Sequence, residues 1–112
     1  MMDPVEIVTK QIEAYNRKNI DAIMVLCSED FKIIRFSDGY VLVDGKEACG
    51  KMHEQLFNNS PHLFAGVIKR IDFNNKIVLY EFIHGRKGDA EKTEQLNIFE
   101  IVHDKIAKLY RL

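Results

Sequence analysis

The sequence has 112 residues, of which 46% are hydrophobic and 29% are charged, and its formal net charge is -1 at pH 7. A chain of this length is typical of one domain with its own core, so we expect a single domain over residues 1–112. The balanced charge gives no attraction to nucleic acid, and no segment approaches the roughly 20 apolar residues of a membrane span. We therefore expect neither nucleic acid nor a membrane as a partner.

The first four residues lack both the positive and the apolar region of a secretory signal, which predicts a cytoplasmic protein. Cys27 and Cys49 each fall on the apolar stripe of a predicted helix. We expect them to be small buried thiols rather than a disulfide pair.

Two helices are predicted at the start of the chain, over residues 3–18 and 19–27. Asp3 as N-cap, followed by Pro4 and Glu6, forms a capping-box pattern. The apolar side chains of the first helix recur every three or four residues: Val5, Val8, Ile12 and Tyr15. Asn19 is the expected N-cap of the second helix, so the two helices meet at a tight corner.

A small hairpin and a third helix come next. Residues 31–36 have the composition of a strand that is apolar on both faces around Arg35, and Asp38-Gly39 turns the chain into residues 40–43. Asp44 is the expected N-cap of the third helix, with Glu47 at the capping-box position. The helix is predicted to end at residues 58–61.

The remaining sequence predicts four strands separated by turns at Asn74-Asn75, in residues 84–92 and at His103-Asp104. The order of two helices, a hairpin, a helix and four strands has no regular alternation of strand and helix. It predicts an α+β fold in which a curved antiparallel sheet wraps around three N-terminal helices. Such a sheet leaves a blind pocket for a small apolar molecule.

Three segments resemble the SnoaL-like branch of the nuclear transport factor 2-like superfamily, which includes the ketosteroid isomerases. They are EAYNRKNIDAI (residues 13–23), DGKEA (residues 44–48) and the hairpin from KRI (residues 69–71) through Glu81 to Gly85-Arg86. The resemblance covers nearly the whole chain and specifies fold better than activity. It implies a cone-shaped α+β barrel and a homodimer packed through the outer faces of the sheets.

The resemblance also assigns three site positions. Ketosteroid isomerases use an aspartate base and an oxyanion hole made of a tyrosine and a protonated aspartic acid. The likeness places Arg35 at the base, and it places Gln11 and Asn97 at the two oxyanion-hole positions. A guanidinium cannot accept a proton near neutral pH, so the usual base is missing, whereas Gln11 and Asn97 can still donate hydrogen bonds to a carbonyl.

Arg35 and Glu81 each allow two interpretations. Arg35 either lies on the concave face and binds a carboxylate, phosphate or enolate, or points outward and pairs with a nearby carboxylate. Glu81 lies within the apolar run of residues 77–83, where burial would raise its pKa and make it a general acid or base, or a partner for Arg35. Alternation does not say which face of this strand is inside, and an exposed face or dimer contact is the competing interpretation. The resemblance favours Glu81 inside.

The expected cavity walls are Tyr15, Met52, Phe64, Leu79 and Phe99, although the Tyr15 hydroxyl can instead bond a backbone carbonyl, and Gln95 is expected in solvent. The four histidines lack the spacing of a metal site, and the glycines form no nucleotide-binding motif, so no metal and no cofactor are expected. No nucleophile pattern surrounds the cysteines or serines.

Our leading hypothesis is a small-molecule-binding protein, acting as an isomerase or lyase by proton transfer on an apolar carbonyl-containing metabolite. Glu81 would be the base, and Arg35 or Asn97 would stabilise the enolate. The alternative hypothesis is a non-catalytic dimeric protein-interaction module.

Overall fold

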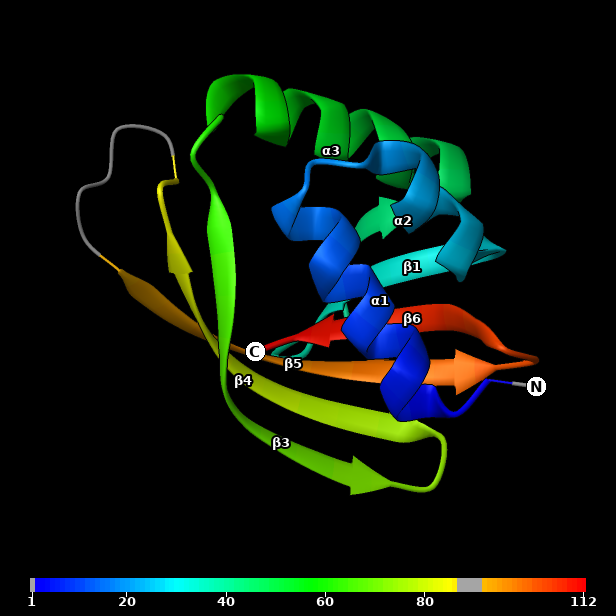
Figure 1. Cartoon of the computed structure of the whole chain (residues 1–112). Helices are drawn as coiled ribbons and strands as arrows, with labels where there is room; N and C mark the ends of the chain where they lie inside the picture. The colour runs from blue at the N-terminus through cyan, green and yellow to red at the C-terminus, as the bar shows by residue number, and fades with distance from the viewer. Residues whose placement is uncertain (1, 87–91) are drawn as a thin grey trace.

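The computed structural model describes residues 2–86 and 92–112 (Figure 1). Its elements, in chain order, are α1 (Pro4–Asn16), α2 (Ile20–Leu26), β1 (Cys27–Arg35), β2 (Val41–Asp44), α3 (Lys46–Asn59), β3 (Phe64–Phe73), β4 (Lys76–His84), β5 (Thr93–Val102) and β6 (Lys105–Arg111). The predicted α+β order is confirmed. The loop expected over residues 84–92 lies partly outside the described residues.

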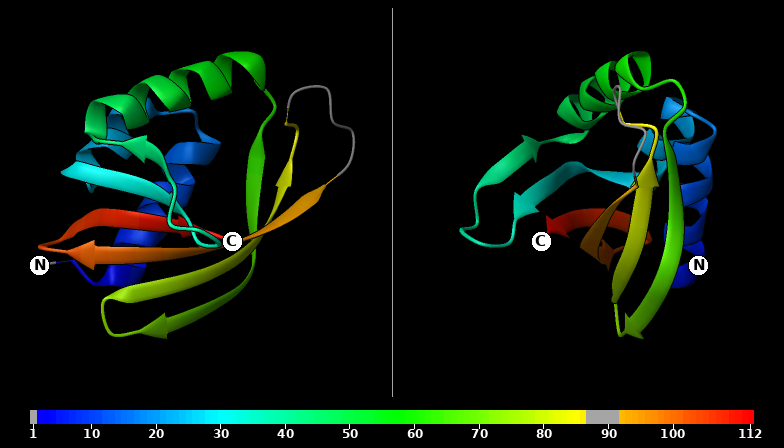
Figure 2. Two further views of the ribbon diagram at one scale, coloured as in Figure 1. Left: turned by 180° about the vertical axis from the view of Figure 1, so that it is seen from behind. Right: turned by 90° about the vertical axis from the view of Figure 1, so that its left-hand side faces the viewer.

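The strands form one curved sheet in the order β2-β1-β6-β5-β4-β3. We expected a fully antiparallel sheet, but β1 and β6 pair in parallel, so the sheet is mixed. Figure 1 shows the three helices on its concave side, and Figure 2 shows that β2 and β3 stay apart as open edges. The cone-like shape expected from the sequence is present, as an unclosed sheet.

The turns predicted at Asn74-Asn75 and at His103-Asp104 are present, each as a two-residue hairpin turn. Phe73 pairs with Lys76 across Asn74-Asn75, and Asn74 has the positive φ of 54° that asparagine tolerates. Val102 pairs with Lys105 across His103-Asp104, and both turn residues have positive φ. These turns fix the register of the meander from β3 to β6.

The Asp3 cap of α1 is confirmed, because its Oδ1 accepts a hydrogen bond from the Val5 amide at 2.8 Å. The cap predicted for α3 is wrong. Gly45 is the N-cap, with φ of 97° and no side-chain hydrogen bond. Asp44 instead ends β2, where it pairs with Lys32 of β1 at 3.1 Å, so the carboxylate is held by the hairpin rather than by the helix.

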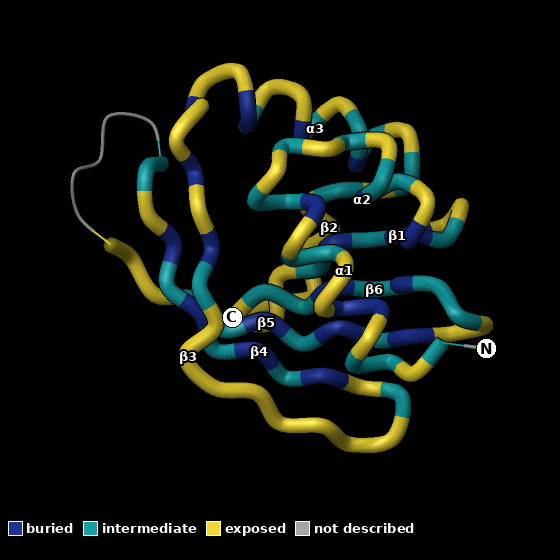
Figure 3. The backbone as a smooth tube through the Cα atoms, viewed as in Figure 1, coloured by how far each residue is buried: buried dark blue, intermediate teal, exposed yellow. Residues whose placement is uncertain are grey.

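β1 begins at Cys27, four positions before the predicted start, because its parallel pairing with β6 already begins at Cys27↔Ile106. The core lies between the concave face of the sheet and the helices. Along β4, buried Ile77, Leu79, Glu81 and Ile83 alternate with partly exposed residues (Figure 3), which places the Glu81 face inside. Among the described residues, no helix combines the length and hydrophobicity that a membrane span requires.

Candidate functional site

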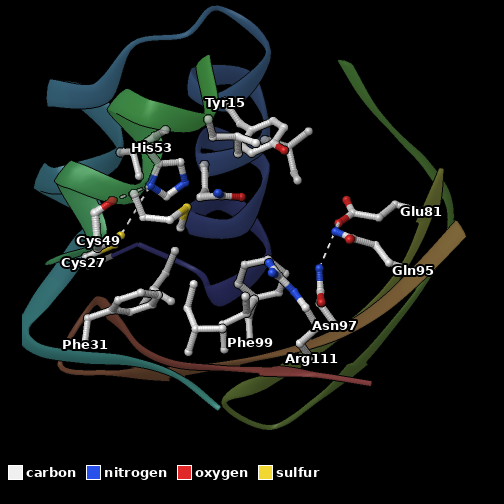
Figure 4. Close-up of a pocket in the computed structure, with 18 of the residues that line it drawn as sticks. Tyr15, Cys27, Phe31, Cys49, His53, Glu81, Gln95, Asn97, Phe99 and Arg111 are labelled. Atoms are coloured by element: carbon white, nitrogen blue, oxygen red, sulfur yellow. Dashed lines mark hydrogen bonds between the residues drawn. The ribbon is translucent and has the colours of Figure 1, made fainter. Parts of the chain in front are cut away.

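A cavity of about 200 Å³ lies between the helices and the concave face of the sheet (Figure 4). Its apolar walls come from both layers: Ile12, Ile23, Phe31, Ile33, Met52, Leu56, Phe99, Ile106 and Leu109. Its polar lining consists of Gln11, Tyr15, Cys27, Cys49, His53, Glu81, Arg86, Gln95, Asn97 and Arg111. Apolar walls with a few converging polar groups are typical of small-molecule sites.

Glu81 is the buried carboxyl of this cavity, and only 3% of the residue is exposed. Its Oε1 accepts hydrogen bonds from Gln95 Nε2 at 2.7 Å and from Asn97 Nδ2 at 2.9 Å. Both donors lie on β5, whose Gln95 is the direct cross-strand partner of Glu81, so the sheet register builds this cluster. Glu81 Oε2 is buried and has no hydrogen-bond partner among residues 2–86 and 92–112.

Burial raises the pKa of the Glu81 carboxyl, and the hydrogen bonds from Gln95 and Asn97 and the charge of Arg111 offset part of this increase. A carboxyl with a raised pKa exchanges protons closer to neutral pH, which suits a general acid or base. The unpartnered Oε2 is the atom available for that exchange.

Tyr15 contributes a hydroxyl from α1, and Figure 4 shows it directed into the cavity. Burial raises the pKa of Tyr15 despite the opposing charges of Arg86 and Arg111. The phenol oxygen of Tyr15 can accept one hydrogen bond while its O–H donates another. The neighbouring Gln11 has a buried, unpartnered Oε1.

Arg111 enters the cavity from β6. It is the cross-strand partner of Asn97, so both side chains lie on the same face of the sheet. Figure 4 shows the Arg111 side chain beside Asn97 and Phe99. Burial lowers the pKa of Arg111, and the nearby charge of Arg86 lowers it further.

His53 and the two cysteines form a second polar group, on the side of the cavity away from Glu81 in Figure 4. His53 Nδ1 lies 2.8 Å from the Cys49 carbonyl oxygen, which only accepts, so Nδ1 carries the proton and neutral His53 has a bare Nε2. Cys27 and Cys49 are free buried thiols. The neighbouring Cys49 thiol and burial raise the pKa of Cys27, whereas the neighbouring Cys27 and His53 side chains lower the pKa of Cys49.

The structure brings six of the residues predicted from the sequence to the cavity wall: Gln11, Tyr15, Met52, Glu81, Asn97 and Phe99. Gln95, which we expected in solvent, also lines the cavity. Within the described ranges 2–86 and 92–112, no group of His, Cys, Asp and Glu side chains is arranged to hold a metal ion.

The cavity position predicted for Arg35 is wrong. Its side chain is 47% exposed, and its guanidinium makes two hydrogen bonds to Asp38, at 2.9 and 2.8 Å, across the turn after β1. The guanidinium also lies 5.0 Å from the centre of the Tyr40 ring. Arg35 is the last residue of β1, where the strand passes beyond the cavity and the local carboxylate binds it.

Two wall residues predicted from the sequence also lie elsewhere. Phe64 is 47% exposed, with its ring near that of Phe82, because it begins β3 at the rim of the sheet. Leu79 points inward but is part of the solid core where α1 contacts β4. Neither side chain lines the cavity.

Three cavity residues were not predicted from the sequence: Arg86, Arg111 and His53. Alternation along the last strand carries the signal for Arg111, because it is two residues after the buried Leu109. For His53, the signal is its spacing of four residues from Cys49 on one helix face. Arg86 follows the end of β4 and has no periodic pattern that would reveal it.

A curved sheet that covers helices on one side and encloses a polar-ended cavity defines the class of ketosteroid isomerase-like and nuclear transport factor 2-like folds. Within that class, the sequence matches the SnoaL-like domain over residues 8–109, and the chain therefore belongs to the SnoaL-like family. No curated protein is similar enough to count as a match.

Solved structures agree on the fold. An uncharacterized cystatin-fold protein from Novosphingobium aromaticivorans superimposes with a TM-score of 0.90 and 18% identity, over 100% of this chain and 99% of its own. A putative polyketide cyclase from Sinorhizobium meliloti gives a TM-score of 0.82 and 16% identity, over 99% and 100% of the two chains. A ketosteroid isomerase-like protein from Catenulispora acidiphila, solved with trimethylamine, gives 0.77 and 15% identity, over 96% and 84%.

Proposed function

We propose that the protein binds a small, mainly apolar molecule that carries a carbonyl group, and that it acts on this molecule as an isomerase or lyase by proton transfer. The observation that carries the proposal is the free Oε2 of Glu81, buried at the cavity wall. The fold of the family and the putative polyketide cyclase among the similar structures support a small-molecule role.

In the proposed reaction, Glu81 Oε2 removes a proton from the carbon next to the carbonyl. Gln95 and Asn97 hold the carboxyl through Oε1, so that Oε2 keeps a fixed direction. The O–H of Tyr15 then donates to the developing enolate oxygen, and Asn97 has a second N–H for the same purpose. Glu81 returns the proton at another carbon for an isomerisation, or loss of a leaving group completes an elimination.

The test begins with a thermal-shift screen of apolar ketones and aldehydes, because a ligand that binds only the folded state raises the melting temperature. For each hit, NMR in D₂O then follows the exchange of hydrogens next to the carbonyl. Glu81→Gln keeps the size and the acceptor oxygen but removes the base, and we expect exchange to fall about 100-fold or more.

Glu54→Gln, on the exposed side of α3, is the matched control and should keep full exchange. Full exchange in Glu81→Gln excludes Glu81 as the base. Binding without exchange in the unmodified protein supports a binding protein instead of an enzyme.

We also propose that the protein forms a homodimer through the convex face of the sheet. There, Ile71 and Phe73 are 56% and 68% exposed, and Ile71 adjoins a hollow lined by Val78, Tyr80 and Leu96. Exposed apolar patches of this kind mark association surfaces. Light scattering should give the mass of two chains and, for Ile71→Lys, the mass of one.

This face also supports the second candidate function, a protein-interaction module. That candidate gains support if the purified chain stays monomeric and if the screen finds no carbonyl ligand. A dimer with an occupied cavity favours the small-molecule function.

A further inference from the structure

The charges around the cavity are unbalanced. The guanidinium and carboxyl groups of its lining are those of the two arginines Arg86 and Arg111 and of the single glutamate Glu81. Among these three groups, positive charge exceeds negative charge by one when Glu81 is ionised. Apolar walls surround these groups, so the interaction of this charge with a ligand is stronger than it would be in water.

Arg111 is the member of this set with the clearest need for a partner. No ion pair to its guanidinium occurs among residues 2–86 and 92–112, and its Nε is buried without a hydrogen-bond partner. Arg86 Nε is also buried and has no partner in the described part of the chain. A guanidinium stays charged at any pH that a protein tolerates, and a buried charge without a partner destabilises the fold.

Glu81 does not serve as the charge partner of the Arg111 guanidinium. Its Oε1 is bound by the amides of Gln95 and Asn97 rather than by either guanidinium. Burial also raises the pKa of Glu81, which favours its neutral form. When Glu81 is protonated, the positive excess in the cavity increases.

The shape of the guanidinium indicates which anion would fit. Its planar N–H groups match the two oxygens of a carboxylate, and paired N–H to oxygen bonds of this kind are strong and directional. On the far side of the cavity, Figure 4 shows Phe31 away from the Glu81 cluster, so the apolar volume extends from the charged end toward β1.

We propose that the ligand of this cavity is a compact apolar carboxylic acid whose carboxylate binds Arg111 and Arg86, with its apolar body directed toward Phe31. This inference rests on the proposed small-molecule function and adds the chemical class of the ligand. The monoanion brings the charge of the cavity to zero while Glu81 is ionised. The Glu81 base and the Tyr15 hydroxyl remain available for a carbonyl elsewhere on the same molecule.

The test compares carboxylic acids with their neutral primary amides, which have nearly the same shape. The probes are phenylacetate, 3-phenylpropanoate, 4-phenylbutanoate and the alkanoates from hexanoate to decanoate, each with its amide. Binding is measured at pH 7.5 by calorimetry and by NMR chemical-shift changes of cavity residues. We expect the best acid to bind about tenfold or more tightly than its amide, a difference typical of one charge-assisted pair.

Arg111→Met keeps the length of the side chain and removes the charge, so this variant should bind the acid and the amide with similar affinity. The control is Arg70→Met, which removes an exposed arginine of β3 that is paired with Asp72 at 2.8 Å. It should keep the preference for the acid.

Each result of this comparison has one meaning. Amides that bind as tightly as acids overturn the carboxylate inference and leave small-molecule binding intact, and a retained preference in Arg111→Met overturns the role of Arg111. If neither the acids nor the amides perturb the cavity, small-molecule binding itself is contradicted. The acid and amide comparison on the unmodified protein does not depend on whether Arg111→Met folds.

Discussion

Glu81→Gln should make the protein more stable at neutral and alkaline pH. The amide oxygen of glutamine can still accept the hydrogen bonds from Gln95 and Asn97, because Glu81 receives both at Oε1. The substitution removes the charge at Oε2, which has no partner. The change in stability therefore isolates the cost of burying this charge.

The direction of this stability change follows from the numbers of protons that the native and the unfolded protein bind. The folded-state pKa of Glu81 lies above its ordinary value of 4.5, chiefly because of burial. Between these two pKa values the native protein binds more protons than the unfolded chain, so the contribution of Glu81 to the free energy of unfolding falls as pH rises. Below the ordinary value the variant and the parent should be equally stable, and above the raised value the advantage of the variant should be constant.

A buried acceptor atom left without a hydrogen bond typically costs about 1–3 kcal/mol, and Oε2 is the one such atom of the Glu81 carboxyl, whose Oε1 is bound. For 112 residues, 1 kcal/mol corresponds to about 4 °C in melting temperature, so we expect an advantage of roughly 4–12 °C. Urea unfolding at pH values from 4 to 9 measures the difference, with Glu54→Gln as the surface control. An advantage that does not change with pH, or a less stable variant at every pH, would refute the reasoning.

Three further substitutions test the packing, each by its effect on the midpoint of urea denaturation. Gly66→Ala places a methyl group 2.2 Å from the Phe82 ring, so it should lower the free energy of unfolding by about 1–3 kcal/mol. Adding Phe82→Leu, which removes the ring, should restore part of this loss. An unchanged midpoint in Gly66→Ala contradicts the close contact. Leu79→Ala leaves a cavity in the core and should lower the free energy of unfolding by about 2–5 kcal/mol. Phe64→Ala, at a half-exposed position, should lower it far less. Equal losses would contradict the difference in burial between Leu79 and Phe64. Asp3→Ala removes the cap of α1 and should cost about 1 kcal/mol, whereas Asp3→Asn should be nearly neutral.

Local chemistry made most of the fold predictable from the sequence. The Asp3 cap and the two tight turns depend on residues close together in the chain, and all three are confirmed. The parallel pair of β1 and β6 joins distant segments, and no local pattern encodes which distant strands become neighbours. The cap predicted at Asp44 failed because Lys32, on the neighbouring strand, binds that carboxylate.

The site residues also divide into those that local sequence indicates and those that depend on which strands become neighbours. The apolar run around Glu81 left the inner face of β4 open, and the resemblance favoured Glu81 inside, as the structure has it. A cation in the cavity was predicted at Arg35, whereas Arg111 lines it. These two residues are direct neighbours in the β1 and β6 register, but only Arg111 lines the cavity. Strand order was the missing information, because alternation alone gives the face of a residue and not its neighbours.

The position of β6 between β1 and β5 also determines the order in which the chain can fold. The meander from β3 to β6 needs only contacts between consecutive strands, whereas the pairing of β1 with β6 joins segments far apart in the chain, and such long closures are slow. Arg111 lies on β6 and therefore forms with the meander. A chain in which only the meander has formed has Glu81 and Arg111 in place but lacks the cavity wall that Phe31 and Ile33 of β1 provide, so ligand capture can report on the docking of β1.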